Sequence, residues 1–91
     1  MFQVKWLQET LDELTRIWMQ ADSSLRQAIT AATHTLDQEL QTDPYREIES
    51  RDDDERLLFA YPLAVQVEVD PVKRIVWVLH VWQFRRRSEL L

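Results

Sequence analysis

The sequence predicts an α+β fold in which two helices pack on one face of an antiparallel sheet, in the order β-α-α-β-β-β. Three observations predict it. Two stretches between residues 7 and 42 repeat apolar residues at helical spacing. Residues 56–84 are rich in β-branched and aromatic side chains, as strands are. The connections between these stretches are short, which favours a helical hairpin followed by an antiparallel meander.

Length and composition set the limits of the prediction. The 91 residues predict one domain over 1–91, and an apolar fraction of 45% is ordinary for a globular chain. We see no run of membrane-spanning length and no signal peptide, so we expect a cytoplasmic protein without a membrane partner. Cysteine and glycine are absent, which excludes disulfides, thiolate metal sites and glycine-rich phosphate loops. We therefore expect no cofactor.

The net charge of −5 is unevenly distributed along the chain. Residues 1–45 carry three basic against seven acidic side chains, whereas residues 46–91 carry eight against nine. An acidic protein repels polyanions overall, so a nucleic-acid site would have to be local. The basic residues near the C-terminus are where such a site is expected.

The first strand and the first helix are distinguished by their periods. Residues 2–6 alternate apolar and polar, which predicts a short strand with Phe2, Val4 and Trp6 inward. From Leu7 the period becomes helical, without a clear capping residue at the start. The expected apolar stripe is Leu7, Leu11, Leu14, Ile17 and Trp18. The residues expected to face away are Glu9, Asp12, Glu13 and Arg16.

The second helix has clearer boundaries. Ser24 with Gln27 fits a capping box at its start, and 42–44 (Thr-Asp-Pro) ends it, because the residue before proline disfavours helix. His34 is expected on its solvated face. Its predicted buried stripe is Leu25, Ile29, Ala32, Leu36 and Leu40.

Four further segments complete the sheet. Residues 45–50 predict an edge strand or an extended connection, and residues 52–55 an acidic turn that is not spaced for a metal ion. Strands are expected at 56–61, 63–69 and 74–84, with a turn at Asp70-Pro71. Because glycine and asparagine are absent, aspartate is expected wherever φ must be positive.

The last strand is apolar on both alternating faces, which is typical of a strand in the middle of a sheet. Strict alternation places one set on each face. The first set is Ile75, Trp77, Leu79 and Val81, and the second is Val76, Val78 and Trp82.

Arginines are the sharpest polar feature. Arg85, Arg86 and Arg87 follow the last strand, and guanidinium groups there could hold a phosphate bidentately. The alternatives are a solvated strand end or a docking patch for an acidic peptide. Arg51 and Arg56 either join these arginines at one edge of the sheet or neutralise the neighbouring acids.

Four more residues complete the candidate site. His80 interrupts the apolar strand and is either a general base or a half-exposed or hydrogen-bonded core histidine. Trp82 and Phe84 are candidates for stacking on RNA bases or for docking a partner. We group Lys73 and Arg87 with them as RNA- or partner-binding residues. Trp6, Trp18 and Trp77 are explained by core filling.

The order of these pieces resembles the RelE/ParE superfamily of bacterial toxins from type II toxin–antitoxin systems. The resemblance covers nearly the whole chain. The matching segments are 2–6 (Phe-Gln-Val-Lys-Trp), 49–51 (Glu-Ser-Arg), 56–59 (Arg-Leu-Leu-Phe), 62–70 (Pro-Leu-Ala-Val-Gln-Val-Glu-Val-Asp) and 76–81 (Val-Trp-Val-Leu-His-Val).

The resemblance implies a small α+β toxin neutralised by an antitoxin that wraps it. RelE-like members cut mRNA in the ribosome, with basic groups stabilising the charge on the scissile phosphate. Carried over by position, the phosphate-handling candidates are Arg51, Arg56, Arg85, Arg86 and Arg87. ParE-like members instead poison DNA gyrase by binding. A degenerate member that acts only as a protein-binding module is the third possibility, and the acidic charge favours it.

Overall fold

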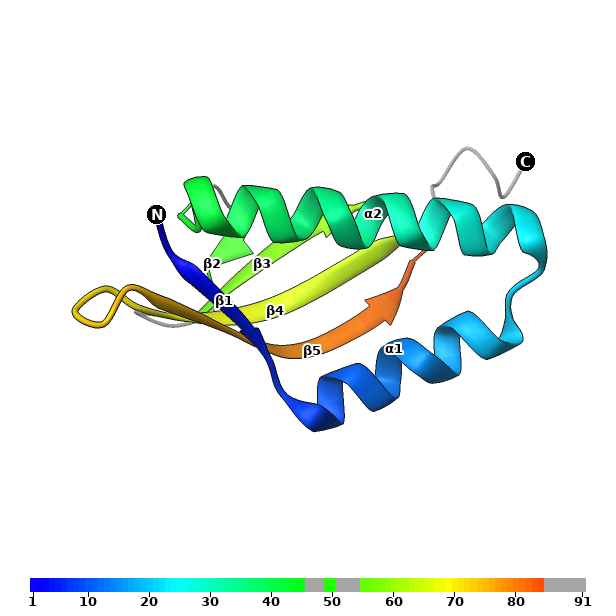
Figure 1. Cartoon of the computed structure of the whole chain (residues 1–91), viewed down its shortest axis with the longest axis horizontal. Helices are drawn as coiled ribbons and strands as arrows, with labels where there is room; N and C mark the ends of the chain where they lie inside the picture. Colours follow the sequence, from blue (N-terminus) through cyan, green and yellow to red (C-terminus); the bar gives the residue numbers. More distant parts are fainter. Residues whose placement is uncertain (46–48, 51–54, 85–91) are drawn as a thin grey trace.

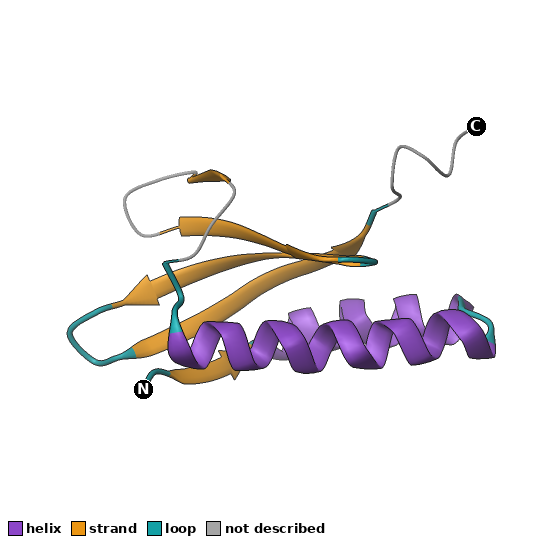
Figure 2. Cartoon of the chain, turned by 90° about the horizontal axis from the view of Figure 1, so that it is seen from above, coloured by secondary structure: helices purple, strands orange, loops and turns teal. Residues whose placement is uncertain are grey.

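The computed structural model describes residues 1–45, 49–50 and 55–84 and has the predicted order of elements. The helices α1 (Gln8–Gln20) and α2 (Ser23–Thr42) form an antiparallel hairpin. Both lie on one side of the sheet, as Figures 1 and 2 show. The prediction of an α+β fold with two helices on one face is confirmed.

The sheet has the strand order β1-β5-β4-β3-β2. Its strands are β1 (Gln3–Trp6), β2 (Glu49–Ser50), β3 (Glu55–Ala60), β4 (Leu63–Asp70) and β5 (Ile75–Gln83). The pairs β2–β3, β3–β4 and β4–β5 are antiparallel, whereas β1 pairs with β5 in parallel. The sheet is therefore mixed, and β5 is an interior strand between β1 and β4, as its two apolar faces predicted. The helical hairpin separates β1 from the meander, which allows β1 to run parallel to its neighbour.

The helix boundaries confirm most of the predicted signals. Helix α1 begins after Leu7 without a side-chain cap, and α2 ends at Thr42, just before Asp43 and Pro44. The predicted cap of α2 is wrong by two residues. Asp22 takes this role, because its Oδ1 accepts the Leu25 N–H at 2.8 Å. A carboxylate at this position also complements the helix dipole.

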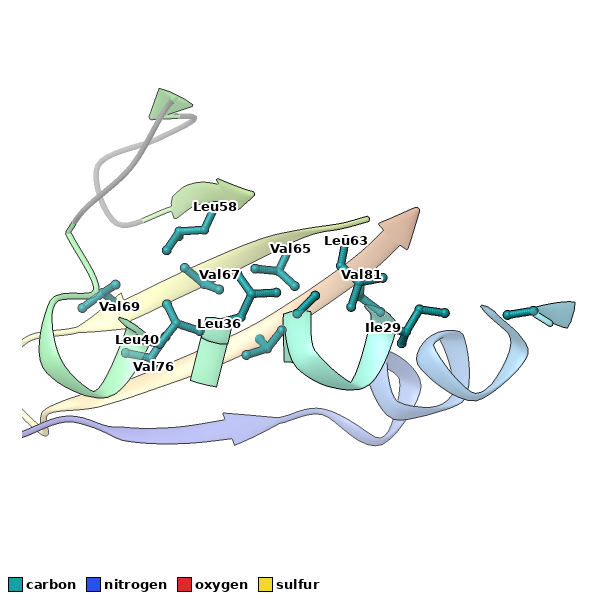
Figure 3. Packing of buried hydrophobic residues seen from close by; sticks show 13 residues of the cluster. Ile29, Leu36, Leu40, Leu58, Leu63, Val65, Val67, Val69, Val76 and Val81 are labelled. Atoms are coloured by element: carbon teal, nitrogen blue, oxygen red, sulfur yellow. The ribbon is translucent and has the colours of Figure 1, made fainter. Parts of the chain in front are cut away.

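The core lies between α2 and the inner face of the sheet (Figure 3). The predicted stripe of α2 packs into it, with Leu25 at its margin. Phe2, Val4 and Trp6 of β1 also pack against it, as predicted. The buried core residues on the strands are Leu58, Leu63, Val65, Val67, Val69, Val76, Val78 and Val81. Because α2 contributes buried residues along its whole length, it fixes the inner face of the sheet.

The inward face of α1 differs from the predicted stripe. Leu11 is 41% exposed, whereas Thr10 is fully buried. Leu14, Ile17 and Trp18 pack against the core as expected. Helix α1 lies along β5, so its inner side meets a strand as well as apolar side chains (Figure 1). A hydroxyl that bonds to that strand is therefore favoured over a leucine.

The turn between β4 and β5 uses aspartate differently from the prediction. Asp70 Oδ1 accepts the Val72 and Lys73 N–H groups, each at 3.1 Å. Among the described residues, Arg74 has a positive φ, of 56°. The expectation of aspartate at such a position is wrong here, because Asp70 caps the turn instead. The Arg74 guanidinium lies 5.7 Å from the centroid of the Phe2 ring.

Candidate functional site

A β-bulge in β5 determines which side chains reach each face of the sheet. Gln66 pairs with His80, but the next residue, Val67, pairs with Val78, so Leu79 is the extra residue. Val76, Val78 and Val81 are therefore all buried on the inner face, at 0, 0 and 4% exposure. The predicted strict alternation is wrong after Val78, because an inserted residue reverses the faces of all that follow.

The reversal places two candidate residues, His80 and Trp82, on the face of the sheet opposite to Val76 and Val78. We call the face of the sheet turned away from α1 and α2 the outer face (Figure 2). Near the end of β5 it carries two cross-strand rows. The first row is Leu57, Gln66 and His80, and the second is Phe59, Ala64 and Trp82. His80 and Trp82 thus lie on the outer face, two residues apart on one strand.

Aromatic rings gather beside Trp82. Phe84 packs edge-on against Phe59 and Tyr61, with ring centroids 5.3 and 5.7 Å apart. The sequence reasoning selected Trp82 and Phe84 but missed Phe59 and Tyr61. Phe59 lies in β3 and Tyr61 directly follows that strand, and their spacing of two residues is the signal that would have found them, because alternate residues of an extended chain share a face. Together with Trp82 these rings offer an apolar surface suited to stacking.

His80 is a surface residue. Its side chain is 56% exposed, and Nδ1 lies 3.5 Å from Glu13 Oε2 on α1. This exposure agrees with the half-exposed histidine of the sequence prediction, and it leaves the imidazole accessible to a substrate. A carboxylate beside Nδ1 favours the proton on that nitrogen, which leaves Nε2 as the acceptor. This arrangement suits a general base. Glu13, expected to face away, instead contacts β5.

Two other candidates lie elsewhere in the fold. Arg56 pairs with Val67, an inner-face residue, and its guanidinium lies 5.7 Å from the centroid of the Tyr45 ring. Lys73 lies in the turn that precedes β5, at the opposite end of that strand from Phe84. The structure therefore brings together His80, Trp82 and Phe84 but does not bring Arg56 or Lys73 to them.

Arg51, Arg85, Arg86 and Arg87 lie outside the described residues, and so do Asp52, Asp53 and Asp54 of the acidic turn. Within the described ranges, no group of three or more histidine, cysteine or carboxylate side chains is arranged to hold a metal ion. No helix in the same ranges is long and apolar enough to cross a membrane.

Arg16 of α1 was not among the predicted site residues, but it lies near the end of β5 that carries the candidate site. Arg16 of α1 lines a hollow of about 290 Å³ between α1 and the end of β5. Glu13 and Trp82 line the same hollow. Arg16 is exposed, as expected for a residue on the outward side of α1. The contact between α1 and β5, which are distant in sequence, brings Arg16 and Trp82 to the same hollow.

A second and larger hollow, of about 490 Å³, lies between the two helices. Its lining includes Trp18, Ile29 and His34. His34 is exposed, as predicted. None of the candidate site residues lines this groove.

The sequence matches no protein-family model and no curated protein sequence. Solved structures do match. The isolated RelE toxin of E. coli superimposes with a TM-score of 0.66 and 15% identity, covering 99% of this chain and 92% of RelE. The chromosomal ParDE toxin–antitoxin system of P. aeruginosa gives a TM-score of 0.68 and 14% identity, covering 93% of this chain and 98% of the other.

The RelBE2 toxin–antitoxin complex of Mycobacterium tuberculosis is also similar, with a TM-score of 0.62 and 15% identity over 92% of this chain and 98% of the matched one. Each superposition spans nearly the full length of both chains. The chain therefore has the fold shared by the RelE and ParE toxins, as its sequence predicted.

Proposed function

We propose that this chain is the toxin of a type II toxin–antitoxin pair. The observation that carries the proposal is the structural likeness to RelE and ParE, which covers 99% and 93% of this chain and 92% and 98% of the matched chains. Several of the matched proteins were solved together with their antitoxins. The partner is accordingly a cognate antitoxin that lays an amphipathic helix or a strand on this domain. The pair acts in the cytoplasm.

The preferred activity is ribosome-dependent cleavage of mRNA. In this reaction the 2′-hydroxyl attacks the neighbouring phosphate. A bond forms between the 2′-oxygen and phosphorus as the bond to the 5′-oxygen breaks. One proton leaves the 2′-oxygen and one is delivered to the 5′-oxygen. Negative charge develops on the phosphate oxygens, so catalysis needs cations beside them and a group that accepts the first proton.

The candidate residues divide these roles. His80 accepts the proton, because it is exposed and has a carboxylate behind its Nδ1. Arg51, Arg85 and Arg86 hold the phosphate. Trp82 and Phe84 stack on bases of the message, while Arg87 and Lys73 contact RNA or the antitoxin.

Arg56 is the candidate whose position favours a different role. Its side chain is half-buried over Tyr45, on the inner side of β3, and it supports the fold there. The phosphate site of the proposal therefore rests on the other arginines.

A second candidate function is a non-catalytic binder of the same fold, acting on DNA gyrase or serving only as a protein-binding module. The net charge of −5 favours it, because such a chain gains little from non-specific attraction to RNA. A gyrase poison would leave translation running while DNA supercoiling failed. A pure binding module would affect neither process.

The test is induced expression in bacteria, with and without a candidate antitoxin encoded beside this chain. The wild type should arrest growth, co-expressed antitoxin should restore it, and Arg85→Ala or Arg51→Ala should relieve the arrest. Loss of one phosphate-holding cation is expected to slow cleavage by about 10²–10³-fold. Unimpaired growth in the presence of folded wild-type protein would reject toxicity. Arrest with intact transcripts but failed supercoiling would select the gyrase alternative.

A further inference from the structure

Two consecutive carbonyl groups of β5 point to the same edge of the strand. In a regular strand they would point to opposite edges. Thr10 Oγ1 lies 2.8 Å from Val78 O and 2.7 Å from Leu79 O, so both oxygens face α1. This geometry belongs to the bulge at Leu79. The Thr10 hydroxyl carries one proton, so the two carbonyls share it, and the side chain that donates it is fully buried.

Glu13 makes the matching contacts beyond the bulge. Its Oε1 accepts the Val81 N–H at 3.2 Å, and its Oε2 lies 3.5 Å from His80 Nδ1. Thr10 and Glu13 are three residues apart and so occupy the same side of α1. Pairing of β1 with β5 ends at Val78. Beyond that residue, α1 binds the β5 backbone on both sides of His80, at Leu79 and at Val81.

We infer that Thr10 and Glu13 are positioning residues for the candidate site. They hold β5 in its bulged register and so keep His80 and Trp82 on the outer face. If the bulge were lost by a slip of one residue, His80 and Trp82 would turn toward the helices and Val81 would leave the core. The effect on catalysis rests on the proposed function. The effect on the register of β5 does not depend on it.

Neither residue needs to touch RNA to have this effect. Thr10 is the fully buried residue on the side of α1 that faces β5, and its described side-chain hydrogen bonds go to main-chain carbonyls of that strand. Glu13 acts on His80 from the Nδ1 side, opposite the nitrogen that accepts a proton in the proposed reaction. Their role is to fix where the imidazole lies and which nitrogen it presents.

The test compares three substitutions of threonine. Thr10→Val removes the hydroxyl at nearly constant volume, and Thr10→Ser retains it. Thr15→Val is the matched control, because the Thr15 hydroxyl lies on the same helix and bonds to its own helix at Leu11 O, 2.8 Å away. Amide hydrogen exchange of Val81 and cross-strand NOEs from His80 to Gln66 report the register of β5.

Thr10→Val should speed exchange of the Val81 amide by about tenfold, which corresponds to one lost hydrogen bond, and should weaken the NOEs between His80 and Gln66. Thr10→Ser and Thr15→Val should resemble the wild type. In a cleavage assay, Thr10→Val should lower kcat with little change in KM, and Thr10→Ser should recover it. Thr10→Val with wild-type exchange and wild-type NOEs would overturn the inference.

Glu13→Gln keeps an oxygen for the Val81 N–H but removes the charge beside His80, so it tests the site even if Thr10→Val fails to fold. It should leave Val81 protected and lower kcat. Unchanged kcat in this variant would refute the role of Glu13. If the wild type cleaves no RNA, the proposed function fails, while the exchange and NOE results still decide whether Thr10 holds the bulge.

Discussion

Deleting Leu79 should remove the bulge and still leave the protein folded. Val78 and His80 then become neighbours, and their partners Val67 and Gln66 are already neighbours on β4. Every later side chain of β5 keeps its face. The deletion removes a half-buried leucine side chain, whose burial contributes about half of the roughly 1.5–3 kcal/mol of a fully buried one. It also removes one of the two carbonyls that share the Thr10 hydroxyl.

The expected destabilisation is therefore about 1–2 kcal/mol, or a fall in Tm of roughly 4–16 °C for a domain of this size. Urea denaturation followed by circular dichroism measures the first quantity and thermal denaturation the second. The urea m-value should stay close to that of the wild type, because the same core is exposed on unfolding.

Deletion of Glu68 is the matched control. Glu68 is exposed and pairs with Trp77 where the ladder is regular, so the deletion removes almost no buried surface of its own. It nevertheless forces either Val67 or Val69 out of the core, at a cost of roughly 1.5–3 kcal/mol for the valine. Lost strand pairing adds to that cost. Equal destabilisation by the two deletions would refute the assignment of Leu79 as the extra residue.

Two further predictions concern residues whose roles the structure revised. Arg56→Ala should lower the free energy of unfolding by about 1 kcal/mol, because the contact with Tyr45 is lost, and the variant should still arrest growth. A variant that keeps the wild-type Tm but no longer arrests growth would instead indicate that Arg56 is catalytic. Asp22→Ala should cost about 0.5–2 kcal/mol in urea denaturation, because the Leu25 N–H loses its acceptor. Ser24→Ala should leave the free energy of unfolding nearly unchanged. A larger loss for Ser24→Ala than for Asp22→Ala would restore the predicted capping box at Ser24.

The order of elements was predictable because it depends on local periodicity. The stripe of α2 and its end before Pro44 are visible in the sequence, and both are confirmed. The parallel pairing of β1 with β5 was not predictable in this way, because it joins residues more than 70 positions apart. The positive φ of Arg74 also depends on tertiary context, since its side chain contacts Phe2.

The site was harder to predict than the fold. A bulge cannot be detected in β5 from alternation, because the residues on both faces are apolar, and Leu79 looks like any other member of the strand. Its support comes from Thr10 and Glu13, about 68 residues earlier in the chain. Sequence reasoning recognised His80, Trp82 and Phe84 by residue type. It could not show that a helix determines the face on which the first two lie.

The most direct test of the account is to map the 5′ ends of transcripts after brief induction of the wild-type chain. If the chain cleaves mRNA in the ribosome, new ends should lie within translated reading frames. They should be absent when ribosomes cannot initiate on the message, and absent for Arg85→Ala. Growth arrest with no new ends in any translated transcript would contradict it.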